Sequence, residues 1–172
     1  MIITKKRYKA VLMKILVFSD SHSHPKYIEE AIKIHGGVCD LVIFLGDGIR
    51  DVDYVKAKYP SIPFFSVKGN CDMLFSSEYP NYSVIDLEGV RVLITHGHVF
   101  GVKGGLERLA NATKELGAKY AFFGHTHIPT DTAIEIDGET IHIFNPGSIS
   151  YGGTYGVVNT SRGVLVLSHG KI

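Results

Sequence analysis

The chain has 172 residues, of which 45% are hydrophobic and 20% charged, and its formal net charge at pH 7 is +1. This length predicts a single domain, residues 1–172, with a substantial core, and the balanced charge gives none of the strong basic signal typical of nucleic-acid-binding proteins. No apolar run reaches membrane-spanning length, and two cysteines are too few for a disulfide framework, so we expect a cytoplasmic protein.

The first two-thirds of the chain alternates predicted strands and helices. After a short N-terminal extension, residues 1–13, buried strands are predicted from the apolar, β-branched runs Lys14–Ser19, Leu41–Leu45 and Ile62–Val67. Helices are predicted between them from the apolar spacing over Pro25–His35 and Val52–Tyr59. This order favours parallel strands joined by right-handed crossovers.

The later part of the chain is richer in predicted hairpins. These pair Tyr82–Leu87 with Arg91–Thr95, Thr132–Ile136 with Thr140–Phe144, and Gly156–Asn159 with Val164–Ser168. A helix over Gly105–Leu116 and a buried strand over Tyr120–Phe123 are expected between the first two hairpins. We therefore expect an α/β fold of two stacked mixed β-sheets flanked by helices, with a mostly antiparallel C-terminal half.

Five predicted strands run into segments that carry potential metal ligands. The segments are Ser19-Asp20-Ser21-His22, Gly46-Asp47-Gly48, Gly69-Asn70-Cys71-Asp72, His96-Gly97-His98 and Gly124-His125-Thr126-His127. In open α/β sheets, ligands bind at the edge where such strands end. A lone histidine after a strand is more often structural, but five such segments together are hard to explain by packing alone.

The types of ligand narrow the choice of metal. Imidazole and carboxylate without thiolate suit manganese, nickel, cobalt, zinc or iron, and we take Mn²⁺ as the leading choice. Seven candidate ligands exceed the four that one zinc ion uses, so we expect two divalent ions sharing Asp47. Such a pair activates water and stabilises the oxygens of an in-line displacement, which predicts hydrolysis.

The same segments resemble the complete motif series of the calcineurin-like metallophosphoesterases. The resemblance spans Lys14 to about Ser150, and the turn Asn145-Pro146-Gly147-Ser148 and the short length make it most similar to the small bacterial and archaeal phosphodiesterase branch. It implies a four-layer sandwich with helices on both outer faces. It also implies that one metal is bound by Asp20, His22 and His127 and the other by Asn70, His96 and His125, with Asp47 bridging.

The chain departs from the family pattern at two places. Many larger members have a histidine where this chain has Cys71, and that histidine can protonate the leaving group or hold the phosphate. His98 is the candidate to supply the missing imidazole. The equally weighted alternative is that His98 lies behind the ligands or at the rim of the site. Arg50 stands where the family often has aspartate, and it either contacts phosphate or lies on the following helix.

We therefore expect a metal-dependent phosphodiesterase that acts on a small phosphodiester by in-line attack of a hydroxide bridging two divalent ions, with catalytic roles for Asp47 and His98. The alternatives are a phosphomonoesterase or nucleotide pyrophosphatase of the same fold, and a non-catalytic protein-binding scaffold resembling a retromer subunit. Retention of all seven ligand residues argues against the scaffold. The loops Met73–Pro80 and Tyr151–Tyr155 are expected to set specificity, and Leu74, Phe75 and Tyr79 are candidate contacts in a homo-oligomer.

Overall fold

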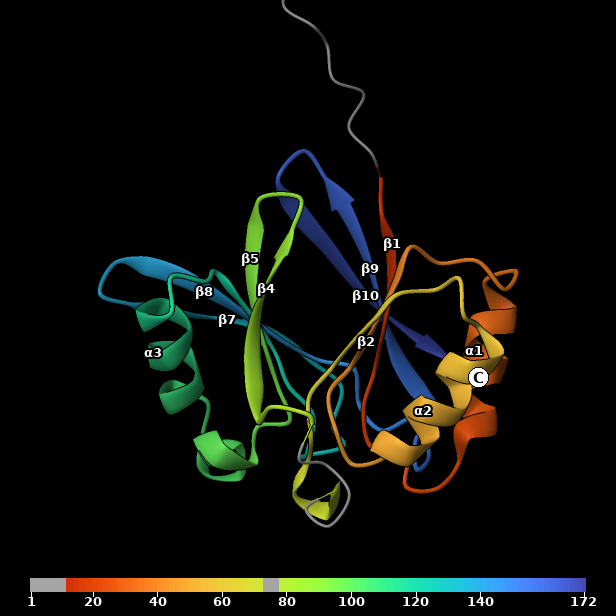
Figure 1. Cartoon of the computed structure of the whole chain (residues 1–172). Helices are drawn as coiled ribbons and strands as arrows, with labels where there is room; N and C mark the ends of the chain where they lie inside the picture. The colour runs from red at the N-terminus through yellow and green to blue at the C-terminus, as the bar shows by residue number, and fades with distance from the viewer. Residues whose placement is uncertain (1–11, 73–77) are drawn as a thin grey trace, which may run out of the picture.

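The computed structural model describes residues 12–72 and 78–172, and in this part of the chain two five-stranded sheets lie face to face. The strand orders are β10-β9-β1-β2-β3 and β4-β5-β6-β8-β7. Helices α1 (Pro25–Ile34) and α2 (Ile49–Lys58) cover the outer face of the first sheet, and α3 (Glu107–Glu115) covers that of the second (Figure 1). The expected α/β fold of two stacked mixed sheets flanked by helices is confirmed.

The first sheet joins the two ends of the chain. Its parallel strands are β1 (Lys14–Phe18), β2 (Leu41–Phe44) and β3 (Phe64–Ser66). The hairpin of β9 (Thr154–Ser161) and β10 (Val164–Lys171) adds to it, since β9 pairs antiparallel with β1. The predicted hairpin between 156 and 168 is confirmed and extends further at both ends.

The second sheet contains more parallel pairing than the sequence indicated. The predicted hairpins form between β4 (Tyr82–Leu87) and β5 (Val90–Thr95), and between β7 (Thr130–Ile136) and β8 (Glu139–Asn145). Strand β6 (Tyr120–Phe122), however, pairs in parallel with both β5 and β8. Helix α3 is therefore the crossover of a further β-α-β unit, which the sequence did not indicate. The other pairings of the C-terminal half, β4–β5, β7–β8, β9–β10 and β1–β9, are antiparallel as expected.

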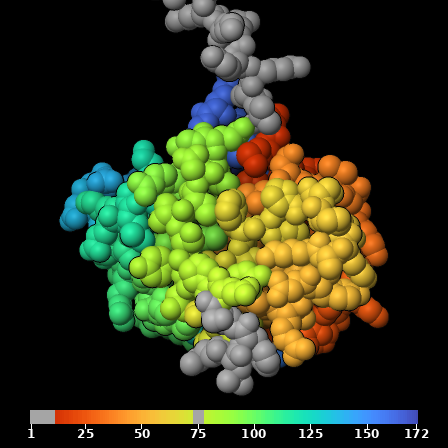
Figure 2. All heavy atoms as spheres, in the orientation of Figure 1, coloured from red at the N-terminus to blue at the C-terminus, as the bar shows by residue number. Residues whose placement is uncertain are grey.

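Three apolar layers hold the sandwich together. Ile15 and Val17 of β1 face the other sheet, whereas Leu16 and Phe18 face α1 and α2, as the alternation of a strand requires. All four are fully buried, which explains the unbroken apolar run of this strand. A third layer packs α3 on the second sheet. In the space-filling view, the green residues of β4 and β5 meet the yellow and orange residues of the first half along the middle of the molecule (Figure 2).

Helix α2 begins earlier than its apolar spacing predicted, at Ile49 rather than Val52. The backbone N–H groups of Gly48 and Ile49 donate to Asp72 Oδ1, at 3.0 and 3.1 Å. A helix leaves its first N–H groups without partners inside the helix, and here a carboxylate from another loop satisfies two donors at this end. The earlier start thus depends on a residue 23 positions away from Ile49.

Part of the prediction lies outside the described residues. This applies to residues 1–11 of the proposed extension and to residues 73–77, which include Leu74 and Phe75. Tyr79 is half-buried rather than exposed, because its hydroxyl donates to Asp53 Oδ1 at 2.6 Å and accepts from Lys56 Nζ at 3.0 Å. Within the described residues, every helix is too short or too polar to span a membrane.

Candidate metal centre

The candidate ligands meet where the strands of both sheets end. From the first sheet, Asp20 and His22 follow β1, Asp47 follows β2, and Asn70 begins a short 3-10 helix, η1 (Asn70–Asp72), after β3. From the second sheet, His96 follows β5, and His125 and His127 follow β6. The loops are joined by backbone hydrogen bonds, from Asp20 N–H to Gly46 O and from Gly124 N–H to His96 O. Both sheets therefore contribute side chains to a single site.

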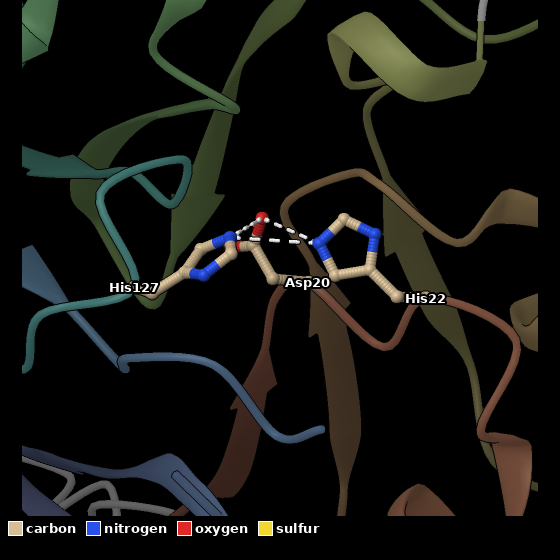
Figure 3. A group of neighbouring side chains, drawn as sticks. All are labelled: Asp20, His22 and His127. Atoms are coloured by element: carbon tan, nitrogen blue, oxygen red, sulfur yellow. Dashed lines mark hydrogen bonds and ion pairs between the residues drawn. The ribbon is translucent and has the colours of Figure 1, made fainter. Parts of the chain in front are cut away.

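Asp20 lies at the centre of the first group of ligands. Its Oδ1 atom is buried and has no hydrogen-bond partner. The Nε2 atoms of His127 and His22 lie 3.1 and 3.7 Å from this oxygen, and Figure 3 shows both rings turned toward it. A buried carboxylate oxygen without a hydrogen bond is unfavourable unless a cation compensates its charge. The three side chains thus fit one metal ion.

A second group forms around His96, which is fully buried. Its Nε2 atom lies 3.4 Å from Asp47 Oδ2 and 3.9 Å from Asp20 Oδ1. Its Nδ1 atom is 2.8 Å from the carbonyl oxygen of Leu45, and because a carbonyl only accepts, Nδ1 carries the proton and Nε2 is available to bind a cation. His125 Nδ1 lies 3.2 Å from the same Nε2 atom. These residues fit a second ion that shares the site with the first.

Asn70 is the predicted ligand that lies at the exposed edge of this cluster. Its side chain is exposed, and its Nδ2 atom donates to Cys71 Sγ at 3.3 Å. The neighbouring Cys71 N–H donates to Asp47 Oδ1 at 2.8 Å, which ties the start of η1 to the bridging candidate. The structure therefore brings Asn70 to the rim of the site, next to Asp47.

Electrostatic coupling within the site opposes the effect of burial. Burial alone would raise the pKa of Asp47, but hydrogen bonding and the charge of His96 outweigh it and lower that pKa. Burial would lower the pKa of His96, but the carboxylates of Asp47 and Asp20 raise it. Burial and the nearby His96 lower the pKa of His125 to about 4. The carboxylates thus favour positive charge at their centre, which a divalent ion would supply in place of a proton.

The backbone at the ligands is strained. Nine described residues other than glycine have a positive φ, and five of them are predicted ligands: Asp20, His22, Asp47, His125 and His127. Side chains rarely adopt this left-handed conformation, which costs about 1–3 kcal/mol at each such residue and concentrates at functional sites. Three others, Glu88, Asp137 and Arg162, lie in hairpin turns, where such backbone is ordinary. The fold therefore holds these predicted ligands in a backbone conformation that residues other than glycine disfavour.

Neighbouring hydroxyl groups orient Asp20. Ser19 Oγ donates to Asp20 Oδ2 at 2.6 Å, and the His125 N–H donates to the same oxygen at 3.1 Å, so only Oδ1 faces the site. The hydroxyls of Ser148 and Ser150 donate to the carbonyl oxygen of Asp20 at 3.0 and 2.9 Å. The turn after β8 therefore holds the backbone of Asp20 in place through two hydroxyl groups, and its residues are not among the predicted ligands.

Asp72 is a functional residue to which the sequence analysis gave no role. Its buried carboxylate accepts backbone N–H groups from four residues: Asp47, Gly48, Ile49 and Gly69. It thereby fixes the loop that carries Asp47, the start of α2 and the loop after β3. Three of its four partners lie 23 to 25 residues away in the sequence, so this role leaves no local signal there.

Three further polar residues surround the ligands. The His98 ring centroid lies 5.5 Å from that of His96 and 6.2 Å from that of His125, and its Nδ1 atom has no hydrogen-bond partner. Cys71 is exposed and lies beside Asp47, which differs from the expectation of a site without sulfur. Arg50 is the second residue of α2, which confirms its expected place on the following helix, and it also lines a cavity with His22, Asp47 and Cys71.

An exposed tyrosine from the predicted specificity loop also reaches the site. The Tyr151 ring stacks on His127 at 5.2 Å between centroids and meets His22 edge-on at 5.5 Å. Its backbone N–H donates to Ser148 Oγ, which links it to the turn behind Asp20. Because 75% of Tyr151 is exposed, the first ligand group has an aromatic rim open to solvent.

Comparison with known families agrees with this geometry. The family model described as the calcineurin-like phosphoesterase superfamily domain matches residues 13–163. The probable metallophosphoesterase YsnB of Bacillus subtilis is 33% identical over 138 residues, which cover 80% of this chain and 75% of the relative. The phosphodiesterase YfcE of Escherichia coli is 32% identical over 161 residues, with 81% and 80% covered.

Solved structures show the same fold. A Streptococcus pneumoniae protein described as a predicted phosphoesterase superposes with a TM-score of 0.73 at 27% identity, over 94% of this chain and 90% of the other. Vps29 of Chaetomium thermophilum has a TM-score of 0.68 at 16% identity, over 93% and 95% of the two chains. At this identity the likeness to Vps29 concerns the fold alone.

Proposed function

Because the chain belongs to the calcineurin-like phosphoesterase superfamily, we propose that it is a metal-dependent phosphodiesterase with two divalent ions and a small phosphodiester substrate. The observation that carries the proposal is the buried Oδ1 atom of Asp20, which lacks a hydrogen bond and faces the Nε2 atoms of His22, His96 and His127. In the proposed centre, Asp20, His22 and His127 hold one ion and Asn70, His96 and His125 the other, with Asp47 shared.

Two ions bound there would lower the pKa of water and stabilise the attacking and leaving oxygens of an in-line displacement. The protein residues prepare the site for this chemistry. The Leu45 carbonyl fixes the tautomer of His96, Ser19 fixes the rotamer of Asp20, and Asp72 holds the loop of Asp47. Mn²⁺ is the first ion to test, and Ni²⁺, Co²⁺, Zn²⁺ and Fe²⁺ are the alternatives for this nitrogen and oxygen set.

His98 is the proposed catalytic group besides Asp47. Its half-buried ring lies next to those of His96 and His125, and we propose that from there it hydrogen-bonds a phosphate oxygen or a leaving group. Burial lowers the pKa of His98 in the metal-free protein, and His96 lowers it further.

The free thiols of Cys39 and Cys71 support the cytoplasm as the place of action.

The deciding experiment measures hydrolysis of bis(p-nitrophenyl) phosphate by chelator-stripped protein before and after addition of Mn²⁺. We expect metal-restored turnover that Asp47→Asn reduces by about 100-fold or more, since loss of a mere partner of a metal ligand already costs about 10- to 100-fold. Asp86→Asn is the matched control, because it changes an exposed carboxylate of β4 that accepts a hydrogen bond from the Gly89 N–H of the following turn. Turnover of p-nitrophenyl phosphate alone would replace the diesterase with a monoesterase, and no turnover with any of the five metals would favour a binding scaffold.

The same assay with two leaving groups tests His98. Loss of turnover in His98→Asn on phenyl esters but not p-nitrophenyl esters would identify His98 as the proton donor, because p-nitrophenolate leaves without protonation. Equal loss on both would identify a contact to the phosphate. Wild-type rates on both would exclude His98 from the catalytic groups.

A further inference from the structure

The exposed thiol of Cys71 belongs to a third group of ligands within the candidate metal centre. One ligand atom each from Cys71, His22 and Asp47 lie within 4.8 Å of one another. The same three residues line one cavity of about 180 Å³, together with Arg50 and Asp72. The three residues therefore combine ligand atoms close enough for one ion with a place in the lining of one cavity.

The chemistry of this group differs from that of the two predicted metal positions. Thiolate is a soft ligand that selects zinc and related ions over manganese or magnesium, whereas imidazole and carboxylate accept many divalent ions. We propose that Cys71, His22 and Asp47 form a binding site for a thiophilic divalent ion such as zinc or cadmium. On binding, the thiol proton passes to solvent and a sulfur–metal bond forms, with no change of oxidation state.

Occupation of this site competes with the hydrolytic arrangement. His22 is a proposed ligand of the first ion and Asp47 the proposed bridge, so an ion held by Cys71 draws both away from those positions. Thiophilic ions are then inhibitors of manganese-supported hydrolysis, a consequence that rests on the proposed function. The site itself rests only on the three ligand atoms and the cavity.

The test titrates Cd²⁺ into reduced, chelator-stripped full-length protein and follows the ultraviolet charge-transfer band of a cadmium–thiolate bond. We expect one such bond per chain, absent in Cys71→Ser and retained in Cys39→Ser. Cys39 is the matched control because it is the other free thiol and is buried in the layer between α1, α2 and the first sheet. No band in the wild type, or an unchanged band in Cys71→Ser, would overturn the proposal.

A second set of variants distinguishes a site made of three ligands from binding by the Cys71 thiol alone. His22→Asn and Asp47→Asn each leave the sulfur in place, and we expect each to weaken Cd²⁺ binding by about 10-fold or more at an unchanged limiting band. His24→Asn is the control, since its imidazole is two residues away and lies outside the group. Equal affinity in all variants would mean that sulfur alone binds the ion and would contradict the site. Because every readout is spectroscopic, a protein without hydrolytic activity is tested equally well.

Discussion

The buried carboxylate of Asp72 holds together the loops that carry Asp47 and Asn70 through hydrogen bonds to their backbone. Its two oxygens accept four backbone N–H groups, at distances from 2.7 to 3.1 Å. A carboxylate that accepts several N–H groups is more strongly bound than neutral acceptors, and removing it leaves the donors without partners. The left-handed backbone of Asp47 is held in place by the same contacts, since Asp47 N–H is one of the donors.

We predict that Asp72→Ala lowers the free energy of unfolding by about 2–4 kcal/mol, because buried N–H groups lose their acceptor. Mn²⁺ affinity should fall as well, since the loop of Asp47 is no longer fixed. Urea unfolding and calorimetric titration with Mn²⁺ measure the two effects. Asp86→Ala removes an acceptor of one exposed N–H and should cost under about 1 kcal/mol. Equal losses in both variants would show that Asp72 has no special role.

The turns after the strands determine how closely the ligand loops approach each other. A Cβ atom on Gly69 would overlap Asp47 Oδ1 and lie 2.5 Å from Asp47 N, and one on Gly46 would lie 2.5 Å from Gly69 N. The loops after β2 and β3 therefore touch backbone to backbone, which only glycine permits. This contact brings Asp47 and Asn70 to the same side of the site.

Gly69→Ala should consequently displace the Asp47 carboxylate and weaken Mn²⁺ binding by about 10- to 100-fold, the range for lost support of a metal ligand. Titration calorimetry measures the affinity, and thermal melting shows whether the fold is intact. Gly104→Ala is the matched control, because no atom lies within 4 Å of its added Cβ. Unchanged affinity in Gly69→Ala would refute the close packing of the two loops.

Across the whole molecule, the candidate metal centre lies at one edge, where the two sheets meet. Asp20, His22 and Asp47 come from the first sheet, whereas His96 and His127 come from the second. Away from this edge the sheets are joined by an apolar layer that includes Val17, Ile43, Phe122 and Phe144. Ions bound between the sheets would therefore stabilise the folded chain as a whole.

Mn²⁺ should raise the melting temperature of chelator-stripped protein. A ligand that binds only the folded state at a hundred times its Kd adds about 2.7 kcal/mol of stability. Differential scanning fluorimetry across a Mn²⁺ series measures the shift, which excess chelator should reverse. Asp20→Asn should remove most of the shift and His24→Asn should keep it. An undiminished shift in Asp20→Asn would place the bound ions elsewhere.

The helices and strands could be predicted from the sequence because their causes are local. Apolar alternation and helical spacing recovered the ten strands and three helices of the described part, with shifted ends. One of these shifts, the early start of α2, has a distant cause in Asp72. The parallel pairing of β6 with β5 and β8 was also missed, since pairing across a crossover leaves no signature within the strands themselves.

The sequence by itself determined the class of fold, the candidate ligands at the strand ends and the family, because the residue type at the end of a strand can be read from the order of residues. Only the tertiary structure decided which of these side chains lie close together, and it placed Asp72 behind Asp47 and Cys71 beside His22 and Asp47. These relations join loops from different strands at distances of a few ångströms. Such distances follow from sheet pairing and backbone contact between glycines, which no local stretch of sequence specifies.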